Sequence, residues 1–442
     1  MIYIYRKKRV ILNQSKDLTQ SMESIKIYQI GLGSYGKHGF EKLIDMHQHM
    51  EKVDIELAGV CDIHPEKLEI AKKYSKTHDI DIKRFQDVDK MYSAARKNKE
   101  EDEKVLIYDA GPSETHAEHI YKSINQNFFH LAERPPSMKR DAHIHEKKLA
   151  KDKPIFWKVD FIERESPVVK KTLDLLSEAE EIEEINVFRE STVGVQKMIN
   201  PVERAGVQGG DILDKMTHEI FVLDFLEEVG QRPNFKLEQA ECKYFLPFKQ
   251  GSDSFMNLKG SKNNSINHQT ATAMTKASFD TGKTRVNLHS SWIGVSSEAK
   301  EVASEIGMKE ELLNGEVKKE NDHLFSEEEA RFYTIKGSQN LLGDLLNGKL
   351  YDLDTGKELE TPDILHDQLY RVLEKAILQA AGEKDSDLTE EEIDLFMNSI
   401  FNIKDEIHNK DHDFYEELSK AKKKVEEKVM GFEDFVEDEV ET

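Results

Sequence analysis

The segment 27–62 places the strongest constraint on the fold of this chain. An apolar run at residues 27–30 leads directly into the loop 31–36, which reads Gly-Leu-Gly-Ser-Tyr-Gly. A helix-like segment follows this loop, and a second apolar run at residues 55–61 ends on Asp62. This order of strand, glycine turn, helix, strand and acid is the order that a dinucleotide-binding βαβ unit requires. The sequence therefore predicts such a unit near the N-terminus.

Each glycine of the loop has its own expected role. Gly31 permits the tight turn, Gly33 lets the backbone approach a pyrophosphate, and Gly36 lets the helix pack closely on the strand. Ser34 and Tyr35 lie in the loop just before the helix, whose free N–H groups and partial positive charge favour phosphate binding. A purely structural turn is the alternative interpretation, because glycine turns are common. The flanking strands, helix and acid favour the cofactor site.

Asp62 predicts which dinucleotide this site prefers. Its carboxylate can accept hydrogen bonds from the adenosine ribose hydroxyls, and it would repel the 2′-phosphate of NADP. The next residues, Ile63 and His64, offer no arginine to receive that phosphate. Lys67 begins a helix nearby and is a cation that could fold back towards it. We expect NAD as the cofactor, with NADP as the weaker alternative.

Charge and composition exclude several classes of protein. The formal net charge of −23 argues against a binder of nucleic acid or of an anionic membrane, because both need a basic surface. Cys61 and Cys242 form neither a disulfide framework nor a C-x-x-C zinc motif, and the histidines show no metal-ligand spacing. No apolar run reaches the roughly 20 residues of a membrane helix. Residues 1–24 resemble a loose extension more than a signal peptide, so we expect a cytoplasmic protein without a bound metal.

Periodicity along the chain predicts an α/β protein of two domains. Strand and helix signals alternate over residues 25–163, which predicts a Rossmann domain with a parallel sheet. Residues 164–360 contain period-two segments, which predict an α+β substrate-binding domain with an open, mainly antiparallel sheet. Within this second domain, residues 212–228 predict one long amphipathic helix. Residues 361–442 are charged and helical, and form a C-terminal extension.

Asp214 and His218 form a candidate catalytic pair on the predicted long helix. Their i,i+4 spacing places both side chains on one helix face, within reach of each other. Histidine suits the removal of a hydroxyl proton near neutral pH, and a neighbouring carboxylate can fix its tautomer. The alternative is structural: Asp214 favours the helix dipole and His218 packs against the sheet. Spacing alone favours this alternative.

Four separated motifs agree in order and spacing with one known family. They are the loop 31–36 with Asp62, Pro112-Ser113-Glu114-Thr115-His116, Glu133-Arg134-Pro135, and Gly209-Gly210 followed by Asp214-x-x-x-His218. With them the chain resembles the Gfo/Idh/MocA family of glucose–fructose oxidoreductase and inositol dehydrogenase, from about residue 25 to residue 380. The resemblance implies catalytic roles for His218 as the base and Asp214 as its orienting partner. It also implies that Pro112, His116 and Glu133 lie in the cofactor site.

Arg134 departs from the family pattern, in which a lysine stands between the glutamate and the proline. In the family, that lysine lies beside the nicotinamide and contacts the reacting oxygen. Arginine keeps the positive charge but is larger and planar and does not give up a proton. The resemblance implies that Arg134 stabilises the oxygen, that Glu133 orients it, and that the bond to Pro135 is cis. Two accounts stay open, an acidic substrate held bidentately or weakened catalysis.

The remaining implications concern substrate, activity and assembly. Arg164, Arg189 and Asn200 lie where the family's substrate domain opens, and they are candidate sugar contacts. The resemblance implies NAD-dependent hydride transfer to or from a secondary alcohol or ketone of a sugar, sugar acid or polyol, with a conjugated non-sugar substrate as a weaker option. It also implies a homo-dimer or homo-tetramer formed through the open sheet, among whose strands Trp292 lies. A sensor or scaffold that has lost catalysis is the competing function.

Overall fold

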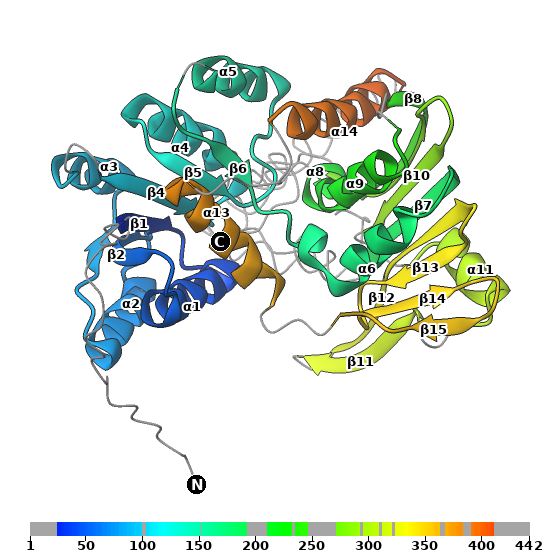
Figure 1. Cartoon of the computed structure of the whole chain (residues 1–442), viewed down its shortest axis with the longest axis horizontal. Helices are drawn as coiled ribbons and strands as arrows, with labels where there is room; N and C mark the ends of the chain where they lie inside the picture. The colour runs from blue at the N-terminus through cyan, green and yellow to red at the C-terminus, as the bar shows by residue number, and fades with distance from the viewer. Residues whose placement is uncertain are drawn as a thin grey trace, which may run out of the picture.

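The computed structural model describes most of the chain between residues 24 and 410. The described ranges are 24–99, 103–151, 153–191, 210–231, 235–245, 271–291, 295–308, 312–320, 323–362, 367–382 and 390–410. Asn200 and Trp292 lie outside these residues, as do most of the predicted N-terminal extension and the end of the C-terminal one. Figure 1 shows two β-sheets on opposite sides of the molecule, each with helices packed against it.

The first sheet has six parallel strands in the order β3-β2-β1-β4-β5-β6. These strands are β1 (Ser24–Ile30), β2 (Asp54–Cys61), β3 (Lys83–Phe85), β4 (Lys104–Asp109), β5 (Phe129–Ala132) and β6 (Trp157–Val159). The crossover helices are α1 (Ser34–His49), α2 (Pro65–His78), α3 (Val88–Lys97), α4 (Ser113–Gln126) and α5 (Arg140–Ala150). Central strands such as β1 and β4 are buried along most of their length, because helices cover both faces. The strand order is that of a Rossmann fold, whose cofactor crevice lies where β1 and β4 diverge.

The second sheet has nine strands and is mainly antiparallel, as the sequence predicted. Its order is β15-β14-β13-β12-β7-β10-β9-β8, with β11 paired to β12, and only β7 and β10 run parallel to each other among the described pairs. The strands are β7 (Ile182–Ser191), β8 (Lys236–Phe245), β9 (Ala271–Asp280), β10 (Arg285–Ser291), β11 (Asn314–Glu320), β12 (His323–Gly337), β13 (Leu341–Asp344), β14 (Lys349–Asp352) and β15 (Lys357–Leu359). Inward side chains such as Ile185 and Tyr333 pack against helix α6 (Pro167–Leu176) and its neighbours.

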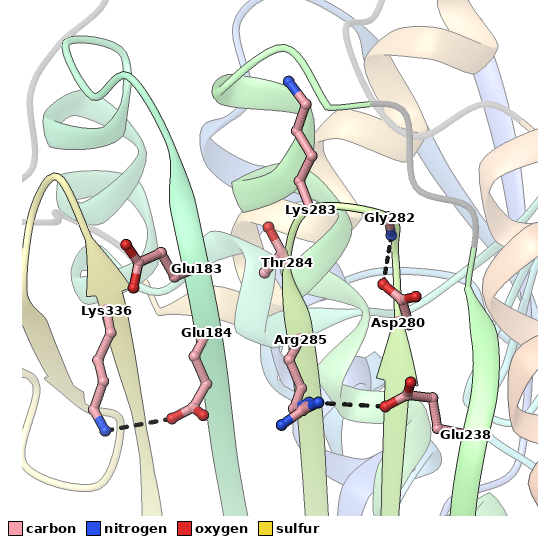
Figure 2. A pocket seen from close by; sticks show the side chains of 9 residues that line it. All are labelled: Glu183, Glu184, Glu238, Asp280, Gly282, Lys283, Thr284, Arg285 and Lys336. Carbon is pink, nitrogen blue, oxygen red and sulfur yellow. Dashed lines mark hydrogen bonds and ion pairs between the residues drawn. The ribbon is translucent and has the colours of Figure 1, made fainter.

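The outer face of the second sheet is polar at one end and apolar at the other. Glu184 lies between Lys336 and Arg285 in the strand register, and Figure 2 shows Lys336 paired with Glu184 and Arg285 paired with Glu238. These side chains border a shallow cavity of about 440 Å³. Further along the same face, Phe188 packs with residues of helix α11 (Ser297–Glu305). This polar end offers no large apolar patch for another chain to cover.

The predicted long helix over residues 212–228 is wrong as a single element. The structure contains three short pieces there, α8 (Gly210–Asp214), the 3₁₀ helix η2 (Met216–Ile220) and α9 (Phe221–Glu228). Every residue of η2 is buried, including the polar His218 and Glu219. A continuous α-helix would place residues 214 and 218 one above the other, whereas the tighter 3₁₀ turn changes the direction of the side chains that follow. The hydrogen bond of His218 to Glu163 and the ion pair of Glu219 with Arg189 stabilise this break.

Two C-terminal helices pack on the rest of the molecule, α13 on the first domain and α14 on both domains. Helix α13 (Gln368–Ala381) packs its apolar side onto α1, and Lys104 Nζ at the start of β4 donates to Ala381 O at 3.0 Å. Helix α14 (Glu390–Lys410) contacts α5 on one side and β8 and η2 on the other (Figure 1). Arg140 of α5 donates to Asp405 of α14 at 2.9 Å. None of the helices in the described ranges is long and apolar enough to cross a membrane.

Glu146 on α5 is a buried carboxyl that should make folding stability depend on pH. Its side chain is 1% exposed, and neither carboxyl oxygen has a hydrogen-bond partner within the described residues. Burial raises the pKa of Glu146 to about 9, so the folded state holds the proton that the unfolded chain releases near its ordinary pKa of 4.5. Below about pH 4.5 the carboxyl is protonated in both the folded and the unfolded chain, so its full contribution to folding stability is present. This contribution is lost as pH rises from 4.5 towards 9, because over this range only the unfolded chain releases the proton. At pH 7 the loss is about 3 kcal/mol.

Glu146→Gln removes this dependence, because the amide has a similar shape and no charge to desolvate. We expect the variant and the parent protein to have similar free energies of unfolding near pH 4.5. At pH 7 the variant should be more stable by about 3 kcal/mol. Urea unfolding at several pH values measures the difference, with Glu178→Gln at an exposed position as the matched control. A stability difference that stays constant across this pH range would contradict the assignment.

Candidate active site

Arg134 and His218 meet between the two domains, although 84 residues separate them in the chain. Arg134 follows strand β5 in a loop whose Arg134–Pro135 peptide bond is cis, as the sequence predicted. Its Nε donates a hydrogen bond to His218 Nε2 at 2.5 Å, and its Nη1 donates to Glu133 Oε2 at 2.8 Å. The structure therefore brings together the predicted base and the predicted electrostatic stabiliser, with Glu133 orienting the arginine.

Glu163, and not Asp214, is the carboxylate that the structure places on the other ring nitrogen of His218. Glu163 lies in the 3₁₀ helix η1 (Ile162–Glu165), and its Oε1 is 2.6 Å from His218 Nδ1. Because Nε2 accepts from Arg134, Nδ1 carries the hydrogen and donates it to Glu163. Asp214 ends α8, before the 3₁₀ turn that holds His218. The prediction that Asp214 orients His218 is corrected by this geometry, since the expected α-helical turn between them is absent.

Arg189 holds Glu163 in place and is directed into the protein, not towards a substrate. It is buried on β7, where its Nη2 donates to Glu163 Oε1 at 2.9 Å and its Nε donates to Glu219 Oε1 at 2.5 Å. Arg164, the second candidate sugar contact, makes a bidentate pair with Asp224 of α9 at 2.7 Å for both bonds. Both guanidinium groups are thus engaged in internal ion pairs. The third candidate, Asn200, lies outside the described residues.

The electrostatics keep His218 neutral and Glu163 ionised. Burial lowers the pKa of His218 well below its usual range, and the positive charges of Arg134 and Arg189 lower it further, against the opposing effect of Glu163. Burial alone would raise the pKa of Glu163, but its neighbours His218 and Arg189 hold it well below its usual range. A neutral imidazole with Nδ1–H fixed on a carboxylate has the tautomer that a proton acceptor at Nε2 requires.

Glu133 and a further carboxyl group, Asp160, interact electrostatically with Arg134. Glu133 and Asp160 follow the adjacent strands β5 and β6. Burial raises the pKa of both carboxyl groups, that of Asp160 to about 6, and the charge of Asp160 raises the pKa of Glu133 further. Tyr35 donates from its hydroxyl to Asp160 Oδ2 at 2.9 Å, and its ring lies 5.9 Å from the Arg134 guanidinium carbon. Tyr35 thus links the glycine loop to the Arg134 loop.

The glycine loop opens onto a cavity of about 830 Å³. Gly31 has a φ of +84°, and a Cβ there would overlap the Ala110 backbone, while a Cβ on Gly36 would overlap the carbonyl of Gly31. A Cβ on Gly33 would meet nothing within 4 Å, so the backbone at that position faces open space. Gly31, Gly33 and Pro112 line the cavity, and Ser34 starts helix α1 beside it. These residues fit a pyrophosphate close to the backbone and to a helix N-terminus.

Asp62 lines the same cavity and also fastens the glycine loop. Its Oδ2 accepts from Leu32 N at 2.7 Å, and its Oδ1 accepts from His64 N at 2.9 Å. A carboxylate has about four acceptor positions, so two remain for ribose hydroxyls. Lys67 Nζ stands 3.8 Å from Asp62 Oδ2, which makes it the nearby cation that the sequence pointed to.

His116, which the resemblance placed in the cofactor site, makes local hydrogen bonds. The side chain is fully buried, with Nδ1 2.8 Å from Pro135 O and Nε2 3.0 Å from Gly111 O. It therefore connects the turn after β4 to the loop that carries Arg134. Among the residues that line the cavity, the structure instead supplies His119, one turn further along α4, with its Nδ1 2.7 Å from Asp109 Oδ2.

Sequence reasoning missed Glu163, Asp160 and the Asp109–His119 pair. Asp109 and Asp160 each stand at or just after the end of a buried parallel strand, where Rossmann folds place their ligand-facing groups. That position was a usable signal for both residues. Glu163 had no such signal, because its contact with His218 depends on how the two domains pack. Among the described residues, no group of three or more His, Cys, Asp or Glu side chains is arranged to hold a metal ion.

Comparison with known proteins identifies the fold. No protein-family model matches the sequence, and no curated protein matches it. Three similar solved structures are UDP-N-acetylglucosamine 3-dehydrogenase GnnA from Acidithiobacillus ferrooxidans (TM-score 0.58, 14% identity, 87% of this chain and 97% of that one), levoglucosan dehydrogenase with NADH and L-sorbose (0.59, 12%, 88% and 98%), and myo-inositol 2-dehydrogenase from Lactobacillus plantarum (0.58, 12%, 87% and 98%). At these identities the likeness concerns the fold. The chain has the two-domain fold of the Gfo/Idh/MocA oxidoreductases, as its sequence motifs predicted.

Proposed function

We propose that this protein is an NAD-dependent oxidoreductase that acts on a secondary alcohol or ketone of a sugar, sugar acid or polyol. The observation that carries the proposal is the buried, neutral His218 held between Glu163 and Arg134. A glycine loop suited to a dinucleotide opens onto a cavity in the adjoining domain. Solved structures of this fold include dehydrogenases of inositol and levoglucosan, one of them in complex with NADH and L-sorbose.

The three side chains divide the chemistry of alcohol oxidation between them. Arg134 does not release a proton near neutral pH, so the hydroxyl proton passes to His218 Nε2. Glu163 accepts from Nδ1 and stabilises the imidazolium that forms. The Arg134 guanidinium stabilises the negative charge that develops on the substrate oxygen. Bound NAD supplies the hydride acceptor for this reaction.

The direct bond between Arg134 and His218 supports an alcohol as the reacting group. Arg134 Nε now occupies the acceptor atom of the base. A substrate hydroxyl can replace this bond with two of its own, because it donates to His218 Nε2 and accepts from Arg134. Only a group with both capacities leaves neither side chain unpaired, and a secondary alcohol has both. This match is our reason for naming an alcohol as the reacting group.

A panel assay tests the proposal directly. The protein is incubated with NAD and a series of sugars, sugar acids and polyols, and the absorbance of the reduced cofactor is followed. We expect turnover with at least one member, and turnover lower by about 10²–10⁴ when His218 is replaced by glutamine. Acidic sugars should be the better substrates if Arg134 holds a carboxylate bidentately. No turnover with any member, in either direction, would contradict the proposal.

Cofactor preference provides a separate prediction. NAD should bind at least about tenfold more tightly than NADP, because Asp62 at the cavity wall repels a 2′-phosphate, and tenfold corresponds to about 1.4 kcal/mol. Calorimetric titration with each dinucleotide measures the ratio. Lys67→Ala serves as the companion variant, and it should not reduce the preference for NAD. Tighter binding of NADP, abolished in Lys67→Ala, would show that Lys67 and not Asp62 sets the preference.

A cofactor-binding sensor or scaffold is the second candidate function. The observation that favours it is the closed contact between Arg134 and His218, in a motif where the family has lysine. A sensor would bind NAD without exchanging hydride during long incubation with any sugar. It would also capture a partner protein only when NAD is present. The buried Glu163–His218 pair weighs against this candidate, because a protein without catalysis has no use for an oriented neutral base.

Assembly and location complete the proposal. We propose a homo-dimer or homo-tetramer in the cytoplasm, acting on small molecules and not on nucleic acid or membranes. The net charge of −23 and the two cysteines support this location. Light scattering coupled to size-exclusion chromatography measures the oligomeric state. The polar row around Glu184 and Arg285 predicts that any contact through that end of the outer face weakens as salt is raised.

A further inference from the structure

We propose that His119 recognises the adenine base of the cofactor, by accepting a hydrogen bond from its exocyclic amino group at Nε2. The inference rests on the proposed function, because it requires a dinucleotide in the cavity of the first domain. His119 lies on α4 and lines this cavity, while its side chain is only 7% exposed. It is thus a buried polar group on a cavity wall that the catalytic chemistry does not use.

Asp109 fixes the orientation of the His119 ring. The Asp109 side chain is completely buried, with Oδ1 accepting from Gly111 N at 3.0 Å and Oδ2 2.7 Å from His119 Nδ1. Burial would raise the pKa of Asp109, but the neighbouring His116 and His119 hold it well below its usual range. An ionised carboxylate only accepts, so Nδ1 of His119 carries the hydrogen. In the neutral ring, Nε2 is then an acceptor.

The surroundings leave Nε2 of His119 as the ring atom available to a ligand. Within the described residues, the other contact of His119 is made by its backbone carbonyl, which accepts from Tyr92 at 2.9 Å. The nearby His130 is occupied by Ser123 at 2.8 Å, and burial lowers the pKa of His130 to about 3, so it adds no charge. Asp109 thus lies behind the imidazole of His119. A carboxylate in this position fixes the tautomer of the ring and makes Nε2 a stronger hydrogen-bond acceptor.

The cavity connects this acceptor to the ribose site. Its wall runs from Asp62 at the end of β2, past residues 86–89 before and within α3, to His119 on α4. A nucleoside whose ribose contacts Asp62 has its base inside this cavity. Adenine offers one exocyclic donor, its amino group, whereas hypoxanthine offers a carbonyl oxygen at the same position. An acceptor on the wall therefore selects adenine and repels hypoxanthine.

The test compares NAD with nicotinamide hypoxanthine dinucleotide by calorimetric titration of the full chain. The parent protein should bind NAD more tightly by on the order of tenfold to a hundredfold, as expected when one buried acceptor is left unpaired. His119→Leu should remove the preference, and His119→Gln, which keeps an acceptor, should retain part of it. His145→Leu, at an exposed position on α5, is the control and should leave the preference unchanged.

Each outcome separates this inference from the proposed function. Equal affinities, or a preference for the hypoxanthine dinucleotide, would overturn the role of His119 while leaving NAD binding intact. A preference that persists in His119→Leu would overturn it as well. If His119→Leu fails to fold, the selectivity of the parent protein and the titration of His119→Gln still decide whether His119 recognises adenine. Binding of neither dinucleotide would overturn both proposals.

Discussion

Replacing His218 by glutamine should lower kcat by two to four orders of magnitude on the best substrate of the panel. The range is the usual contribution of a general base. Glutamine keeps a polar side chain of similar length in the buried site but accepts no proton at neutral pH. Because burial and two arginines lower the pKa of His218, the base stays deprotonated at acidic pH. The kcat/KM of the parent protein should therefore hold its neutral value as pH falls through the ordinary histidine range near 6.5.

The control for this prediction is His289→Gln. His289 is also buried, but it lies on β10 and stacks on Phe188 on the outer face of the second sheet. Its replacement should leave kcat and the pH profile unchanged. Steady-state kinetics across pH, with calorimetry to show that NAD still binds, measures both variants. If His218→Gln retains the parent kcat, His218 is not the base and the proposed division of roles fails.

Arg134→Ala should lower kcat by about 10²–10³, the typical loss for one electrostatic stabiliser of an oxyanion. The expected effect on NAD affinity is small, because Arg134 contacts His218 and Glu133 and does not line the dinucleotide cavity. The variant also frees His218 Nε2 of its present partner. If kcat falls although Arg134 no longer occupies His218 Nε2, stabilising the substrate oxygen matters more than access to the base.

Arg134→Lys separates the two accounts of this unusual residue. If the arginine is tuned to an acidic substrate, lysine loses the bidentate contact and activity on sugar acids falls. If arginine marks weakened catalysis, lysine should raise activity on neutral polyols. Initial rates on matched acidic and neutral sugars distinguish the outcomes. Arg84→Ala, on the exposed edge strand β3, is the control. Unaltered kinetics in Arg134→Ala would remove Arg134 from the site altogether.

The sequence was sufficient for the fold because its signals are local. The glycine loop, the apolar parallel strands and the period-two segments each report on neighbours within a few residues. Positions such as Gly31 and Gly36 carry steric requirements that no other residue meets, so their roles could be stated from sequence. The cis bond at Pro135 was implied by the family resemblance of a contiguous motif, and the structure confirms it.

The partner of His218 could not be predicted, because it is set by long-range packing. Asp214 was chosen for its spacing, yet Glu163 stands 55 residues from His218 and reaches it only after the two domains pack together. The same holds for Arg189, which was expected to face a sugar and instead binds Glu163 and Glu219. The family resemblance pointed to His218, whereas neither the resemblance nor local spacing pointed to the carboxylate that contacts it.

The position of helix α13 has a consequence for how the protein is made. Its apolar residues Leu369, Leu373 and Ile377 belong to the same core as Phe40 and Leu43 of α1. During synthesis the first sheet emerges early, but the helix that covers α1 leaves the ribosome only after the whole of the second sheet. Until then, the apolar face of α1 in the nascent first domain stays uncovered. A fragment ending at residue 163 should aggregate, and adding residues 361–410 in trans should restore its solubility.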